Sequence, residues 1–178
     1  MRLSLRYSGV MTTILLTGSS RGIGAAAKAS LEARGAKVIG QATSSKAVDT
    51  VPADFCEPGA PHELWEAALA RTGGEIDVLI NNAGLFDPNP LDRSDIEWLD
   101  AWEDTMRINL TASAQLSRFA VKHWQERGFP GRIVHVASRA GHRGDSPAHW
   151  HYAASKGGML AMHKTIARQY AHQGILSF

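Results

Sequence analysis

Short apolar runs alternate along the chain with longer segments in which apolar residues recur at every third or fourth position. The short runs are rich in β-branched and aliphatic residues, which is typical of buried parallel strands. Five such strands are expected, at Thr13 to Thr17, Lys37 to Gly40, Val51 to Phe55, Ile76 to Ile80 and Arg132 to Ala137. Gly174, Ile175 and Leu176 open a sixth run close to the last residue.

The longer segments predict helices that connect these strands. They run from Ile23 to Arg34, from Pro61 to Arg71, from Ile96 to Arg127 and from Tyr152 to His172. The third of these segments is expected to be a short helix that leads into a long one through Glu103 to Glu126. Only a short polar link, Thr43 to Thr50, joins the second and third strands, so a crossover helix there is expected to be short or absent. Strands that alternate with helices predict an α/β doubly wound parallel sheet with helices on both faces.

Composition and charge narrow the class of protein. A chain of 178 residues with 44% hydrophobic and 20% charged residues is typical of one soluble globular domain. The net charge is only +2, and Lys and Arg are scattered among acids, so no nucleic-acid partner is expected. Cys56 is the single cysteine, which excludes a disulfide within the chain and fits a reducing compartment.

The first residues do not have the pattern of a secretion signal. Ser4, Arg6, Ser8 and Gly9 interrupt the apolar positions, and nowhere do about 18 apolar residues follow one another as in a membrane span. We therefore expect a cytoplasmic protein without a membrane partner. Met11 offers a second start, so residues 1–10 are interpreted as a dispensable arm and 11–178 as the single domain.

A glycine-rich turn follows the first strand, with the sequence TGSSRGIG from Thr17 to Gly24. Gly18, Gly22 and Gly24 would allow a sharp turn, close approach of a pyrophosphate and the start of a helix whose positive end faces that phosphate. A glycine-rich turn without a ligand is the alternative. The position between a strand and a helix favours a dinucleotide site.

A second pattern places a possible acid–base group near a cation. Tyr152 and Lys156 are four residues apart on a predicted helix and so share one face, while Ser138 ends the fifth strand. An adjacent ammonium favours the phenolate and lowers the tyrosine pKa from its usual value of about 10. Tyr152 could then act as a general acid, although a tyrosine–lysine pair is also common on helix surfaces.

In combination these motifs resemble the short-chain dehydrogenase/reductase family. The shared features are the TGxxxGxG turn, the NNAG sequence at Asn81 to Gly84, Ser138, and the pair of Tyr152 and Lys156. The region from Gly35 to Ser44 is similar to the 3-oxoacyl-carrier-protein reductase branch. The resemblance implies a Rossmann-type fold and an oxidoreductase that interconverts a carbonyl and an alcohol, both small molecules.

The resemblance also implies a catalytic tetrad of Asn109, Ser138, Tyr152 and Lys156. Tyr152 would protonate the carbonyl oxygen while a hydride arrives from the nicotinamide, and Ser138 would hold that oxygen by a hydrogen bond. Lys156 would also bind the nicotinamide ribose. Asn109 would anchor a water that connects Lys156 to solvent.

The cofactor implied is NADP, with NAD possible. No acid follows the second strand to hold ribose hydroxyls and repel a 2′-phosphate, and Arg21 can pair with that phosphate. Tyr152 and Lys156 would contact the cofactor as well. The other cofactor-binding residues implied by the family are Gly18, Ser20, Arg21, Gly22, Ile23, Gly24, Thr43, Asp54, Asn82, Ala83 and Gly84.

Histidines raise the question of a metal. His149 and His151 flank Trp150, but two histidines fall short of the three or four protein ligands of zinc sites. No metal is expected, and these histidines are interpreted as lining the substrate entrance.

The chain departs from the family pattern in its loop lengths and at its end. Tyr152 follows Ser138 by fourteen positions, one more than the commonest family spacing. The family's last strands are expected to be lacking, so the domain would be incomplete at the C-terminus. Two alternatives follow: an active enzyme, or a catalytically weak or inactive dinucleotide-binding fragment or dimerisation partner. A homo-oligomer formed through the two long helices is also expected.

Overall fold

The computed structural model describes residues 11–44 and 49–178, and its centre is a six-stranded parallel sheet. The predicted arm, residues 1–10, lies outside the described residues. The strands are β1 (Thr13–Leu16), β2 (Lys37–Ala42), β3 (Thr50–Pro52), β4 (Val78–Asn81), β5 (Gly131–His135) and β6 (Ile175–Ser177). Their order across the sheet is β3-β2-β1-β4-β5-β6.

Helices connect most of these strands and cover both faces of the sheet. The α-helices are α1 (Gly22–Glu32), α2 (Ala60–Thr72), α3 (Asp95–Met106), α4 (Ala112–Arg127), α5 (Ala140–Arg143) and α6 (Trp150–Tyr170). A π-helical turn, Arg107–Thr111, joins α3 to α4, and a 3-10 turn, Ala171–Gln173, follows α6.

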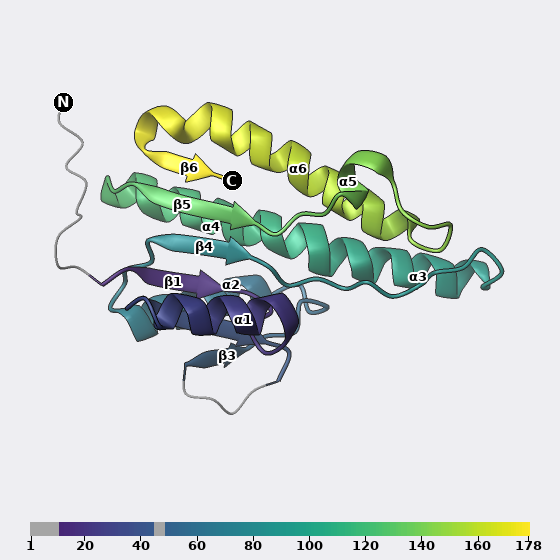
Figure 1. Ribbon diagram of the computed structural model, residues 1–178, viewed down its shortest axis with the longest axis horizontal. Coiled ribbons are helices and arrows are strands. Elements are labelled where there is room, and N and C mark those ends of the chain that lie inside the picture. The colour runs from purple at the N-terminus through teal and green to yellow at the C-terminus, as the bar shows by residue number, and fades with distance from the viewer. Residues whose placement is uncertain (1–10, 45–48) are drawn as a thin grey trace.

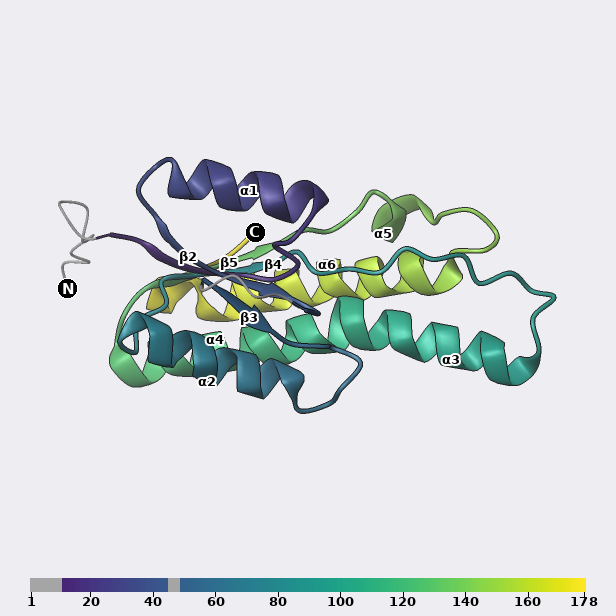
Figure 2. The ribbon, with the colours of Figure 1, turned by 90° about the horizontal axis from the view of Figure 1, so that it is seen from below.

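The layers follow the doubly wound pattern (Figures 1 and 2). α1 lies on one face of the sheet, and α2, α4 and α6 lie on the other. The strand order reverses direction between β1 and β4, which are direct neighbours. In such sheets ligands bind in the crevice at the carboxyl ends of the strands next to this reversal. The predicted Rossmann-type fold is confirmed.

The core is divided by the sheet. Successive strand residues point to opposite faces, so Leu15 of β1 packs with α2 and α4 while Ile14 and Leu16 pack with α1. Trp124 of α4 is the largest fully buried side chain, and its indole Nε1 donates to the carbonyl of Ile76 at 2.7 Å. This bond joins α4 to the segment that enters β4.

Several elements differ from the sequence expectation in their bounds or in their type. The third strand was expected through Phe55 but ends at Pro52, and the carboxylate of Asp54 then accepts from the N–H of Cys56 in a tight turn. The segment from Ile96 to Arg127 contains a shorter and a longer helix, as expected, but they meet in the π-helical turn, and the longer helix begins at Ala112 rather than at Glu103. The irregular stretch before the last helix contains the short helix α5.

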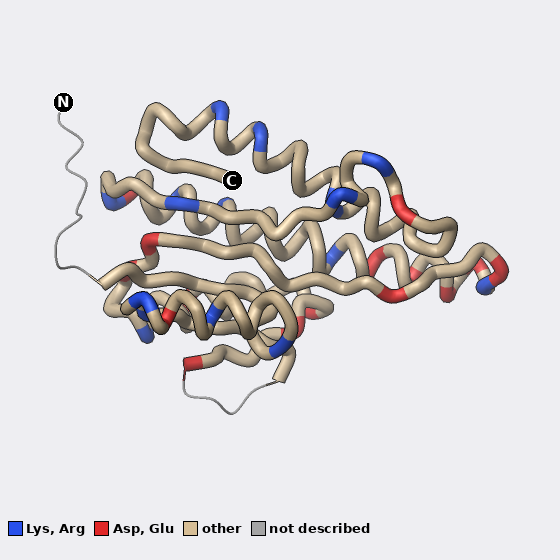
Figure 3. The backbone as a smooth tube through the Cα atoms, in the orientation of Figure 1, with Lys and Arg blue, Asp and Glu red and all other residues tan. Residues whose placement is uncertain are grey.

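Helices α1, α2 and α4 carry charged residues of both signs, whereas α3 carries only acidic ones and α6 only lysine and arginine (Figure 3). The segment before α3 is richer in acids, and α3 begins with a capping box in which Ser94 and Glu97 bond each other's backbone N–H groups. Asp95 and Glu97 also lie where the helix dipole favours negative charge. Within the described residues, every helix is too short or too polar to cross a membrane.

Candidate active site

The glycine-rich turn after β1 is hydrogen-bonded to the end of β4 and to the residues that follow it. Thr17 Oγ1 accepts from the backbone N–H groups of Asn82 and Ala83, both at 2.9 Å, and donates to the carbonyl of Ile80 at 3.3 Å. Asn82 Nδ2 donates to the carbonyls of Thr17 and Gly18 at 2.9 and 3.0 Å. The NNAG segment therefore holds the turn from one side, at the point where the strand order reverses.

The three glycines of the turn occupy positions that a larger residue would strain or block. Gly18 and Gly22 have positive φ angles of 63° and 53°. A Cβ on Gly24 would lie 1.9 Å from the carbonyl oxygen of Gly18. α1 begins at Gly22 with Arg21 as its N-cap, and within residues 11–44 and 49–178 no side chain caps the N–H groups of its first turn. Such a helix start fits the pyrophosphate of a dinucleotide.

Gln41 supports this turn and was missed by the sequence analysis. Its side chain is 3% exposed, accepts from the N–H of Gly18 at 2.8 Å and donates to the carbonyl of Ala53 at 2.7 Å. Its own carbonyl accepts from the N–H and hydroxyl of Ser19. A polar residue directly after an apolar strand run was the only signal in the sequence.

The remaining predicted cofactor residues lie at the same edge of the sheet. Thr43 follows β2, Asp54 follows β3 and Gly84 follows β4, so all three lie beyond the carboxyl ends of parallel strands. These three residues are exposed, as are Ser20, Arg21 and Ile23 of the glycine turn and the first turn of α1. The structure thus brings the predicted cofactor residues to one edge, and their binding role stays a prediction.

Tyr152 and Lys156 lie on one face of α6, as their spacing predicts. Lys156 is 4% exposed, and its Nζ lies 5.8 Å from the centre of the Tyr152 ring and donates to the carbonyl of Val136 at 2.8 Å. Burial lowers the pKa of Lys156 to about 8, because a buried ammonium loses hydration. The lysine remains mainly protonated at neutral pH.

Ser138 reaches this region because α5 packs closely against α6. Its hydroxyl accepts from the N–H of Ala140 at 3.1 Å at the start of α5. One residue further, a Cβ on Gly141 would lie 2.8 Å from the backbone of Lys156 and Gly157. Only glycine allows α5 to approach α6 so closely, and this contact holds the segment with Ser138 beside the turn with Lys156.

Asn109 is fully buried in the π-helical turn. Its Oδ1 accepts from the N–H of Leu85 at 2.7 Å, and its Nδ2 donates to the Leu85 carbonyl at 3.0 Å and to Ser155 Oγ at 3.1 Å. A Cβ on Gly84 would lie 3.5 Å from Asn109 Oδ1 and 3.8 Å from Lys156 Nζ. The two predicted tetrad residues therefore meet at Gly84, and the water contact expected of Asn109 stays a prediction. Single π-helical turns of this kind are frequent at functional sites.

Phe86 is a further side chain at this site that the sequence analysis did not identify. Its ring stacks on His149 with 4.1 Å between ring centres and meets the Tyr152 ring edge-on at 4.6 Å. The aromatic character of the segment after NNAG was its only signal. His149 and His151 were both expected at the substrate entrance. The Phe86 ring lies between His149 and Tyr152, whereas His151 is only 2% exposed and is buried instead.

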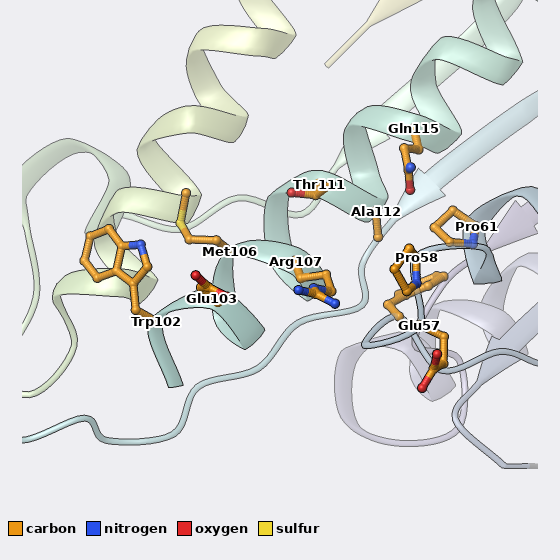
Figure 4. A pocket seen from close by; sticks show the side chains of 11 residues that line it. Glu57, Pro58, Pro61, Trp102, Glu103, Met106, Arg107, Thr111, Ala112 and Gln115 are labelled. Atoms are coloured by element: carbon orange, nitrogen blue, oxygen red, sulfur yellow. The ribbon is translucent and has the colours of Figure 1, made fainter. Parts of the chain in front are cut away.

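A cavity of about 490 Å³ lies apart from these groups, between the start of α2 and the α3–α4 junction (Figure 4). Pro58, Pro61, Trp102 and Met106 form apolar parts of its lining, and the guanidinium of Arg107 donates to the carbonyl of Cys56 at 2.9 Å beside it. Among the described residues that line it there is no member of the predicted tetrad or of the glycine turn.

Comparison with known sequences places this arrangement in a family. The model of the family described as short chain dehydrogenase matches residues 12–176. The 3-oxoacyl-(acyl-carrier-protein) reductase FabG of Haemophilus influenzae is 36% identical over 171 residues, which cover 90% of this chain and 69% of that protein. The 3beta-hydroxysteroid dehydrogenase 1 of Eggerthella lenta is 33% identical, over 92% of this chain and 66% of that protein.

Solved structures agree with the sequence matches. A 4-hydroxyisoleucine dehydrogenase complexed with NADH superposes with a TM-score of 0.81 and 28% identity, over 92% of this chain and 71% of that one. A short-chain dehydrogenase from Streptomyces avermitilis superposes with a TM-score of 0.82 and 25% identity, over 94% of this chain and 64% of that one. Both of these neighbours are dehydrogenases.

Proposed function

This chain belongs to the short-chain dehydrogenase family, and we propose that it transfers a hydride between NADP(H) and a small carbonyl or alcohol substrate. The single observation that carries the proposal is the buried ammonium of Lys156 beside the ring of Tyr152. A buried cation is costly unless it stabilises a nearby negative charge, and a phenolate at Tyr152 is such a charge.

The residues divide the reaction between them. In the reducing direction, the Tyr152 hydroxyl donates its proton to the carbonyl oxygen, and the Ser138 hydroxyl donates a hydrogen bond to the same oxygen. Lys156 stabilises the phenolate that forms, and the phenolate regains its proton from solvent. A reduced nicotinamide dinucleotide held at the glycine turn by Gly18, Gly22 and Gly24 would supply the hydride to the carbonyl carbon and would become oxidised, so that the C=O π bond would be replaced by C–H and O–H bonds.

The main test removes the proton donor alone. Tyr152→Phe should lower kcat for carbonyl reduction by about 100-fold or more, while the Kd of NADPH changes by less than about twofold. Tyr170→Phe is the matched control, because Tyr170 is a half-buried tyrosine at the far end of the same helix. Turnover by Tyr152→Phe close to that of the parent would show that another group donates the proton.

The preference for NADP(H) rests on Arg21 and on the absence of an acid at Thr43 and Ser44, directly after β2. Arg21 is exposed at the start of α1, where a guanidinium can form paired hydrogen bonds with a phosphate. The neighbouring structure that was solved with NADH makes NAD the competing cofactor.

Titration with both reduced cofactors tests this preference. Arg21→Ala should weaken NADPH binding by about tenfold, in line with the loss of a charge-assisted bond, and leave NADH binding nearly unchanged. Arg34→Ala, an exposed arginine beyond the other end of α1, is the control and should change neither Kd. Tighter binding of NADH than of NADPH by the parent protein would overturn the preference.

We also propose that residues 11–178 act as one dinucleotide-binding and catalytic domain and that the chain forms a homo-oligomer through α4 and α6. These two long helices contact each other on one face of the sheet (Figure 2).

A further inference from the structure

Phe86 lies beside the predicted proton donor and is still largely open to solvent. The side chain is 54% exposed, although two aromatic rings contact it. His149 covers one face of the phenyl ring with nearly parallel planes, 13° apart, and Tyr152 contacts the ring at an angle of 76°. A single exposed apolar residue is ordinary on a protein surface, but this one lies at the reaction centre.

The backbone on both sides of this stack is fixed. Leu85, the preceding residue, is hydrogen-bonded through both its N–H and its carbonyl to the side chain of Asn109. Three residues after Phe86, the N–H of Asn89 donates to the carbonyl of Ala148 at 2.8 Å, which ties this segment to the one that carries His149.

The partner ring is fixed as well. His149 Nδ1 lies 2.7 Å from the hydroxyl of Ser146, within hydrogen-bond distance, so the imidazole has a defined orientation against Phe86. A pair of rings held in this way loses little conformational entropy when a ligand stacks on it. The pair therefore provides a preformed aromatic surface next to the ring of Tyr152.

This surface has a defined chemical preference. Aromatic rings gain energy from stacked or edge-on contacts beyond the burial of apolar area, whereas a saturated ring of the same size gains only the burial. We propose that Phe86, supported by His149, selects carbonyl substrates whose carbonyl is attached to a flat aromatic or conjugated ring. The inference rests on the proposed function, because it assigns a substrate class to that same site.

The test uses two ketones with the same carbon skeleton, acetophenone and cyclohexyl methyl ketone. Their Kd values are measured by titration calorimetry with the Tyr152→Phe protein, with and without NADPH, so that turnover is strongly slowed during the titration. Tyr152→Phe keeps the ring that contacts Phe86. We expect acetophenone to bind more tightly, and Phe86→Leu in the same background to reduce the ratio of the two Kd values by about 2- to 10-fold.

Phe129→Leu is the matched control for this change. Phe129 is a partly exposed phenylalanine next to Gly128, at the opposite end of the strands from Tyr152, and its ring lies under the guanidinium of Arg127. This variant should leave both Kd values unchanged. If Phe86→Leu weakens both ketones equally, Phe86 only packs against Tyr152 and the inference is wrong. It is equally wrong if the ratio does not change or if acetophenone does not bind measurably.

Turnover separates this inference from the proposed function. If the unsubstituted protein oxidises NADPH with both ketones at similar kcat/KM and Phe86→Leu leaves that ratio unchanged, the aromatic preference fails while the oxidoreductase stands. If the Kd ratio depends on Phe86 but neither ketone is reduced, the aromatic surface is supported and the proposed reaction fails.

Discussion

The ammonium of Lys156 has to be charged when it stabilises the phenolate of Tyr152, so its protonation should set one limb of the pH profile. Burial lowers the pKa of Lys156 from 10.5 to about 8. The cation is therefore present below about pH 8 and is lost above it, well before an exposed lysine would titrate. We expect kcat/KM for carbonyl reduction to fall about tenfold per pH unit above that value.

A pH series from about 6 to about 10 checks this, since kcat/KM reports groups of the free enzyme. Lys156→Arg keeps a charge over this whole range, so any residual activity should lose the alkaline limb. An unchanged limb in this variant would assign the titration to another group.

His135 makes stability, rather than activity, depend on pH. It is 8% exposed, its Nε2 has no hydrogen-bond partner among the described residues, and burial, with nearby His163 and Lys156, lowers its pKa to about 4. The unfolded chain binds this proton near pH 6.5, so the stabilising contribution is complete above that value and is lost as the pH falls from about 6.5 to about 4. The loss amounts to about 3 kcal/mol.

Urea unfolding between about pH 4 and about pH 7 measures this dependence. His135→Gln, which keeps hydrogen-bonding atoms but does not titrate, should flatten the free energy of unfolding over this range. His142→Gln, at an exposed histidine of α5, should leave the dependence unchanged. Equal slopes for the parent and His135→Gln would contradict the assignment.

At the scale of elements, the contact of β5 with α4 depends on Gly131, a glycine that no sequence motif marks as important. A Cβ on Gly131 would lie 2.0 Å from the Trp124 ring, a contact that requires the ring to move. Trp124 is 2% exposed, and its indole N–H donates a hydrogen bond to the carbonyl of Ile76, so the ring has little freedom to move. Gly131→Ala should therefore lower the free energy of unfolding by about 1–3 kcal/mol, the usual cost of overpacking.

A double-mutant cycle assigns this cost to the contact. Trp124→Leu makes room for the added methyl group, so Gly131→Ala should cost clearly less in that background, as measured by urea unfolding. If Gly131→Ala lowered the free energy of unfolding equally in both backgrounds, the loss would arise in the backbone of β5 rather than from contact with Trp124.

Element type was predictable from the sequence, but several boundaries were not. β1 and β4 are buried on both faces, so their apolar runs and the glycine or asparagine positions that follow them define them well. β3 was expected to end three residues later than it does, because Ala53 and Phe55 are buried in the core after the strand has ended. An apolar pattern in the sequence indicates which residues are buried. Here burial continues past Pro52, where the hydrogen bonds between β3 and β2 end.

The parts of the candidate site that depend on residues close together in the sequence were predictable. Local spacing placed Tyr152 and Lys156 on one helix face, and the turn after β1 follows from its glycines. Gln41 and Phe86 were not found, because each acts through contacts with residues more than ten positions away. Such contacts exist only after the sheet has assembled.

At the scale of the whole molecule, the arrangement of helices predicts which face joins two copies. α4 and α6 lie next to each other on the sheet face opposite α1 (Figure 1), and Ala161 is an exposed small residue on α6. If two copies pack through this pair of helices, a charge at Ala161 is forced into a dehydrated contact. Light scattering with size-exclusion chromatography should give a dimer or larger assembly for the parent.

Ala161→Glu should shift the mass toward that of the monomer, and the shift should grow as the protein is diluted, because assembly follows mass action. Ala29→Glu introduces the same charge on an exposed position of α1, on the other face of the sheet, and should leave the mass unchanged. A monomeric parent would refute association altogether. A shift caused by Ala29→Glu and not by Ala161→Glu would instead assign the interface to the face of α1. On that face, in the part of the chain that the structure describes, α1 does not lie over β4, β5 and β6 (Figure 1).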